Sequence, residues 1–298
     1  MSGPAPQDAA HGVDERLAAQ IETIALARIA DDKLVLPAFP LVTARCLEFL
    51  RRPDHSVQKA AAIIETDPIL AARLVRLANS AAFATREPAR SIQTAAARLG
   101  VNRLRTALIE VSARPVLESR DPRITVAARG MWEHSLAVAL IARDAAVICA
   151  LPDPEDAYLA GLLHDVGKPV LATLLLEAET MVAARGYRNW VNSDVWIAVL
   201  QRTHRKVGVA LARRWALPEG VCNAIEECGD YDPVDRRSVA NVVRLANALA
   251  KKEGVYVGPA VPEQEAALVM VGRSLLDVDD AALGRRTVGL RERVRSAG

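Results

Sequence analysis

The chain has 298 residues, of which 51% are hydrophobic, 25% charged and 4% aromatic, with a formal net charge of +2. This length allows a large buried core and one or two domains, and the balanced charge does not by itself indicate a nucleic-acid-binding protein. Its four cysteines form no Cys-x-x-Cys pair and are interpreted as small core residues or as free thiols of a reducing compartment.

The first half of the chain alternates turn signals with helical patterns, after a tail at 1–14 that has no signal-peptide pattern. Two prolines predict an extended segment at 34–40. Capping residues then mark the predicted helices. These helices are 57–65 after Ser56, 69–79 after Asp67–Pro68, a short helix from Ser91 to Gly100, and 102–111.

A break at 115–124, rich in proline and charge, separates this half from a second run of predicted helices. The second run comprises a long helix through 134–148, a helix from about Asp153 to His164, a helix from Ser193 to Trp215, and helices at 219–227 and 236–252. The sequence therefore predicts an all-α protein of two packed helical subdomains. The expected parts are a flexible tail at 1–14, subdomains at 15–114 and 125–252, and a helical tail at 253–298.

No stretch approaches the ~20 uninterrupted apolar residues that a membrane span needs. The best candidate, at 136–148, is interrupted by Arg143 and Asp144. We therefore expect a cytoplasmic protein that does not contact membranes.

The dipeptide His164–Asp165 is the strongest chemical signal, because imidazole nitrogen and carboxylate oxygen both suit zinc, iron or manganese. Gly161 and Gly167 flank it, so another helix or a ligand can approach the pair closely. The alternative interpretation is a helix-end pair in which Asp165 meets Lys168 on the surface.

Two further histidines, His134 and His204, fall on apolar stripes of the neighbouring predicted helices. A single histidine on such a stripe is more often a hydrogen-bonded core residue than a ligand. Three of them around one carboxylate favour a shared site. His11 and His55 lie in the tail and near a helix start, and they are interpreted as exposed.

The motifs WEHS at 132–135 and GLLHDVGK at 161–168 resemble the HD superfamily of metal-dependent phosphohydrolases. Further segments resemble the HDOD family, a group of HD-related output domains of bacterial signalling proteins. They are LPAFP at 36–40, IETDPIL at 64–70, RLANS at 76–80, SIQTA at 91–95, HRKVG at 204–208 and RWALP at 214–218. The resemblance covers 34–247 and implies that the second subdomain is HD-like.

The chain departs from the catalytic pattern of that superfamily. Asn247 stands where HD enzymes carry a last metal-binding aspartate, and Glu226-Glu227-Cys228 stands where relatives often have a His-His pair. The Gly-Tyr-Pro signature of cyclic-di-GMP phosphodiesterases is absent, since Gly186-Tyr187 is followed by Arg188. A binuclear hydrolytic site needs more carboxylates and imidazoles than remain here.

The resemblance therefore implies at most one divalent metal, Fe, Mn or Zn, on a face formed by His134, His164 and Asp165. His204 is a fourth ligand or a phosphate contact, and Lys168 and Asn247 complete the predicted ligand-binding set. No residue is assigned a catalytic role.

Three functional hypotheses follow. The leading one is a non-catalytic signalling module that binds a protein partner or a small nucleotide-like ligand through the degenerate pocket. The second is a mononuclear phosphohydrolase acting on a nucleotide or phosphate ester. The third is a DNA-binding regulator, because 93–109 imitates a helix-turn-helix with Arg103 and Arg105 on its second helix. An ordinary αα-hairpin with solvated arginines is preferred to this last hypothesis, and the oligomeric state stays open.

Overall fold

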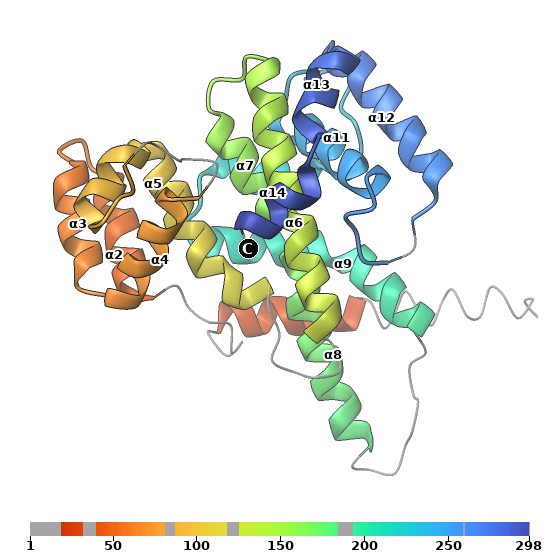
Figure 1. Cartoon of the computed structure of the whole chain (residues 1–298). Coiled ribbons are helices and arrows are strands. Elements are labelled where there is room, and N and C mark those ends of the chain that lie inside the picture. The colour runs from red at the N-terminus through yellow and green to blue at the C-terminus, as the bar shows by residue number, and fades with distance from the viewer. Residues whose placement is uncertain are drawn as a thin grey trace, which may run out of the picture.

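The computed structural model describes residues 19–31, 40–80, 87–117, 125–183, 193–258 and 260–297. Within these ranges the regular structure is entirely helical, which confirms the predicted all-α class. Figure 1 shows α2–α5 grouped on one side of the molecule and α6, α7 and α11–α14 on the other. The predicted tail at 1–14 and the extended segment at 34–39 lie outside the described residues.

The first group of helices begins where local capping chemistry predicts. The Ser56 hydroxyl accepts a hydrogen bond from the amide of Lys59, and one Asp67 carboxylate oxygen accepts from the amides of Ile69 and Leu70. A positive φ of 70° at Gly100 breaks α5, at the turn that the sequence predicts. The helices are α2 Leu41–Leu50, α3 Val57–Glu65, α4 Pro68–Ala78 and α5 Ile92–Leu117.

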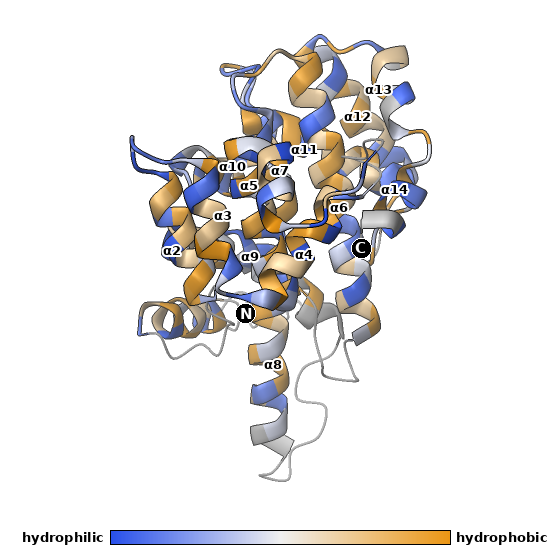
Figure 2. Ribbon diagram, turned by 60° about the vertical axis from the view of Figure 1, so that its left-hand side comes forward, coloured by the Kyte–Doolittle hydropathy of each residue, from blue (hydrophilic) through white to orange (hydrophobic). Residues whose placement is uncertain are grey.

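The second group carries the His-Asp motif and the C-terminal part of the chain. Its helices are α6 Thr125–Ile148, α7 Pro154–Leu163, α8 Gly167–Ala183, α9 Ser193–Arg214, α10 Glu219–Glu227, α11 Val239–Lys252, α12 Pro262–Leu276, α13 Asp280–Thr287 and α14 Leu290–Ala297. Figure 2 shows that α14 is mostly hydrophilic, although its Leu290 and Val294 are buried.

The expected break at 115–124 begins later than predicted, because α5 continues through Pro115 to Leu117. Proline is tolerated so near the end of the helix, where its missing amide costs one hydrogen bond. The rest of the break, 118–124, is not among the described residues. Side chains join the two groups: the Tyr158 hydroxyl of α7 donates to Glu110 of α5 at 2.9 Å. The division at this point stays a prediction.

An apolar stretch at Pro154–Thr180, spanning α7 and most of α8, is long enough to cross a membrane by length and composition alone. The sequence-based candidate at 136–148 was therefore not the best one. Inside the protein, 83% of the apolar window is buried, as in a core helix of a soluble protein. The helix at residues 19–30 lies against α8 and α9, since Arg28 pairs with Glu177 and Lys206 with Glu22.

Candidate functional site

Two glycines bring two neighbouring helices, α6 and α9, close to the His-Asp motif. A Cβ on Gly161 would lie 2.9 Å from the Cα of Ala139, so α7 packs directly on the backbone of α6. A Cβ on Gly167 would clash with the carbonyl oxygen of His204, so the start of α8 packs directly on α9. The close approach predicted at both glycines is observed, and it places His134 of α6 and His204 of α9 on either side of the motif.

Three imidazoles share one arrangement of hydrogen bonds. The Nδ1 atoms of His134, His164 and His204 lie 2.7, 2.8 and 2.8 Å from the main-chain carbonyl oxygens of Val255, Gly161 and Leu200. A carbonyl can only accept, so Nδ1 carries a proton in each ring, and in a neutral ring the lone pair is then on Nε2. This second contact fixes the tautomer and the ring orientation, as it does in metal-binding histidines.

The Asp165 carboxylate lies at the centre of these rings. His164 Nε2 is 3.4 Å from Oδ2, and His204 Nε2 is 3.3 Å from Oδ1. The ligand atoms of His134, His164 and Asp165 all lie within 4.8 Å of one another, and all three residues are buried. Lys168 also reaches the site, with Nζ 2.5 Å from Asp165 Oδ2. The structure therefore brings together five of the six predicted site residues.

These donor atoms fit a metal ion. The Nε2 atoms of His134 and His164 are buried and have no hydrogen-bond partner among the described residues. Burying such an atom without a partner is unfavourable. A lone pair directed toward a carboxylate is also repelled, unless a cation lies between them. Two imidazoles and one carboxylate are a donor set typical of a mononuclear transition-metal site.

The protonation states agree with this fit. Burial lowers the pKa of His134 to about 3 and that of His164 to about 4, so both rings are neutral at pH 7. Burial raises the pKa of Asp165, but the Lys168 ammonium, 2.5 Å from Oδ2, helps to hold that pKa well below its usual range. At neutral pH the site therefore presents neutral imidazoles and an ionised carboxylate, the forms that bind metal.

The positions that depart from the catalytic pattern lie on α10 and α11. Asn247 is half-buried on α11, and its Oδ1 has no hydrogen-bond partner among the described residues. Glu226 and Glu227 are exposed. Cys228 is buried, and burial raises the pKa of its thiol to about 11, so it offers no thiolate at neutral pH. The Gly186–Arg188 segment lies outside the described residues.

The sequence interpretation missed Val255 and Tyr256, which follow α11. Val255 supplies the carbonyl that orients His134, and the Tyr256 ring lies edge-on to His134 with centroids 5.0 Å apart. Lys251 Nζ lies 4.8 Å from the centroid of the Tyr256 ring. Because 121 residues separate Val255 from His134, no local sequence pattern could have revealed the contact.

The arginines of the helix-turn-helix hypothesis contact acidic residues of the same chain. Arg105 lies 3.3 Å from Asp153 and 3.4 Å from Asp156, and Arg103 lies 3.7 Å from Glu155. These contacts fasten the second half of α5 to the start of α7. They favour the αα-hairpin interpretation over a DNA-reading helix.

Solved structures share this fold. A candidate metal-dependent phosphohydrolase from Shewanella amazonensis SB2B matches 94% of this chain and 98% of its own, with 24% identity and a TM-score of 0.69. An HDOD domain protein of unknown function from Geobacter sulfurreducens matches 94% and 99%, with 25% identity and a TM-score of 0.66. A candidate signal transduction protein from Marinobacter aquaeolei VT8 matches 94% and 64%, with 20% identity and a TM-score of 0.61.

A curated relative, an uncharacterised protein of Treponema pallidum, is 28% identical over 249 residues. The match covers 79% of this chain but only 46% of the relative, so the chain spans about half of the relative's length. The HDOD domain itself matches residues 36–231, most of the chain and all the elements that hold the His-Asp motif. The chain therefore belongs to the HDOD family.

Proposed function

We propose that this protein is a cytoplasmic regulatory module whose HD-derived site holds a single divalent metal and does not hydrolyse phosphate esters efficiently. One observation carries the proposal. Three imidazoles, each held by a main-chain carbonyl, place their Nε2 atoms around one buried carboxylate. Iron, manganese or zinc would be held by His134, His164 and Asp165, with His204 as a fourth contact.

The absence of efficient hydrolysis follows from the donor set. A metal at this site supplies Lewis acidity, but a bridging hydroxide needs a second metal and more carboxylates. Asn247 adds no charge, and Glu226 and Glu227 are exposed. Lys168 further neutralises Asp165 through the contact at 2.5 Å. Metal or ligand binding would then act on a signalling partner through changes in the packed helices.

A mononuclear phosphohydrolase is the second candidate. The convergence of His134, His164 and Asp165 favours it, since the same geometry would orient a metal toward a phosphate ester. One similar structure is named a candidate metal-dependent phosphohydrolase. That name describes the other protein and not this chain.

Metal analysis of the purified full chain tests the proposal, with p-nitrophenyl phosphate and nucleotides assayed in parallel. We expect about one metal per chain in the wild type, loss of the metal in His164→Ala, and turnover near the blank in both. His55→Ala is the matched control, because His55 also donates Nδ1 to a carbonyl oxygen but is exposed. Metal retained by His164→Ala would refute the site. Wild-type hydrolysis abolished by a chelator and by Asp165→Asn would favour the enzyme instead.

A further inference from the structure

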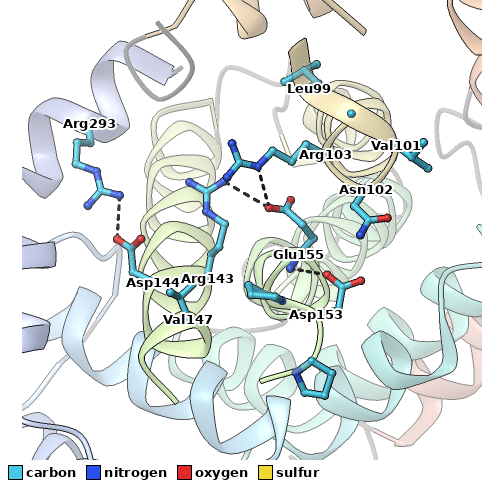
Figure 3. A pocket seen from close by; sticks show the side chains of 13 residues that line it. Leu99, Val101, Asn102, Arg103, Arg143, Asp144, Val147, Asp153, Glu155 and Arg293 are labelled. Atoms are coloured by element: carbon cyan, nitrogen blue, oxygen red, sulfur yellow. Dashed lines mark hydrogen bonds and ion pairs between the residues drawn. The ribbon is translucent and has the colours of Figure 1, made fainter. Parts of the chain in front are cut away.

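A cavity of about 820 Å³, whose lining includes none of the histidines of the site, is drawn in Figure 3. It is bounded by the kink of α5 at Gly100, the last turns of α6, the first turn of α7, and α14. This volume is in the range of small-molecule binding sites. Because α5 belongs to the first group of helices and α6, α7 and α14 to the second, a ligand there would contact both groups.

Three guanidinium groups from three helices line this cavity: Arg103 of α5, Arg143 of α6 and Arg293 of α14. Arg103 and Arg143 share one carboxylate, that of Glu155, at 3.7 and 4.0 Å. Both distances exceed hydrogen-bonding range, so these are loose charge contacts. Arg293 makes a closer contact of 3.1 Å with Asp144.

Two of the arginines lie closer to solvent than the carboxylates that they contact. The side chains of Glu155 and Asp144 are only 10% and 11% exposed, whereas those of Arg103 and Arg293 are 49% and 36% exposed. Arg143 is largely buried, at 16% exposed, and its guanidinium lies 5.1 Å from the centroid of the Tyr158 ring. Asp153 caps the start of α7 and also contacts Arg105, so it is engaged elsewhere. The cavity therefore presents the guanidiniums of Arg103 and Arg293 toward solvent and that of Arg143 deeper in its wall, with the carboxylates of Glu155 and Asp144 holding their orientation.

Apolar side chains form the remaining wall of the cavity. Val147 is a large hydrophobic residue that is 54% exposed, and Val101, Pro152 and Pro154 also line the cavity. Exposed apolar surface beside clustered arginines matches a ligand with a phosphate at one end and a flat, weakly polar ring at the other. Arginine suits both parts, because its planar fork binds phosphate oxygens and stacks on rings.

We propose that this cavity binds a phosphorylated small molecule of the nucleotide class. Its phosphate would lie between Arg103 and Arg143 and replace Glu155 as their common partner, with Arg293 at the edge and the base against Val147 and the prolines. The proposal goes beyond the metal site and does not depend on it.

Calorimetric titration of the full chain with AMP, GMP, ADP and inorganic phosphate, in EDTA, tests this proposal. We expect the nucleotides to bind, and Arg143→Gln and Arg103→Gln each to weaken binding about tenfold. Glu155→Gln should tighten it, because the guanidiniums lose their internal counter-ion. Arg129→Gln, an exposed position on α6, is the control and should leave affinity unchanged.

Arg143→Gln and Glu155→Gln are expected to change nucleotide affinity in opposite directions. This separates a binding defect from a folding defect, since misfolding would weaken nucleotide binding by both variants. Equal binding of inorganic phosphate and nucleotides would overturn the nucleotide class. No nucleotide binding at about 1 mM, or weaker binding by Glu155→Gln, would overturn the proposed site. His164→Ala should bind AMP like the wild type, so failure of the metal site and failure of this site are distinguishable.

Discussion

Individual residues determine the charge state of the HD-derived site. Asp165 is the carboxylate on which the imidazoles converge, and the Lys168 ammonium at 2.5 Å is its nearest positive charge. Asn247 is a neutral amide at the position where the resemblance to HD enzymes predicts a metal-binding aspartate. In the proposed function, one neutral residue in place of an acid, together with one internal cation, would reduce the negative charge available to bind and activate a metal.

Restoring the acid tests this account. Asn247→Asp should lower the stability of the metal-free protein by roughly 1–2 kcal/mol, because a partly buried carboxylate loses hydration. Manganese should reverse that loss and raise the bound metal, while phosphatase activity stays near the blank. Thermal melts with and without metal give the measurement, and Asn223→Asp, exposed on α10, is the control. Unchanged metal content would show that Asn247 does not face the site.

A second buried acid, Glu110, makes stability depend on pH. Burial raises its pKa from 4.5 to about 7, although its hydrogen bond to Tyr158 opposes this shift. Between those pH values the folded chain keeps a proton that the unfolded chain releases, so rising pH favours unfolding. The free energy of unfolding therefore falls by about 3 kcal/mol at most, and this decrease is complete above pH 7.

Glu110→Gln should remove this dependence, since the amide stays neutral and can still accept from Tyr158. Urea denaturation between pH 5 and 8 should show that the stability of the variant, relative to that of the wild type, increases as pH rises. Glu48→Gln, exposed on α2, should follow the wild type. Parallel curves for Glu110→Gln and the wild type would contradict the assignment.

At the scale of elements, the site depends on how closely α8 approaches α9. Gly167→Ala would drive a methyl group into the His204 carbonyl and push the two helices apart. We expect a loss of about 3 kcal/mol in stability and weaker metal binding, as His204 moves from Asp165. Gly220→Ala, where nothing lies within 4 Å of the added Cβ, is the control. Equal effects of both substitutions on denaturant midpoints would exclude this packing role.

Helix boundaries were predicted best where the signal is local. The predicted starts of three helices agree with the structure, because capping and proline chemistry act within one turn. They are the starts after Ser56, at Asp67–Pro68 and at Glu219. The stripe positions of His134 and His204 were also informative. The contacts of Val255 and Tyr256 and the arginine cavity were not predictable, because they depend on a main-chain carbonyl and on helices far apart in sequence.

At the scale of the whole molecule, the C-terminal helix reaches the site indirectly. Arg291 of α14 donates to the carbonyls of Glu253 and Gly254, at 2.9 and 3.5 Å, beside the Val255 carbonyl that orients His134. Arg291→Ala should weaken metal binding roughly threefold with little loss of stability, because it loosens this segment. Metal titrations of that variant and of Arg295→Ala, exposed on the same helix, make the comparison. Identical affinities would show that α14 does not influence the site.

The three imidazoles also differ in when they can be oriented. His164 and His204 use carbonyls three and four residues earlier in the chain, so their acceptors form with their own helical turns. The acceptor of His134, the Val255 carbonyl, is synthesised 121 residues later, so His134 cannot be oriented before then. During synthesis the nascent chain therefore holds an incomplete set of donors until Val255 has emerged and docked. In the proposed function, the ability to retain a metal would then report that the chain has been made and folded as far as Val255.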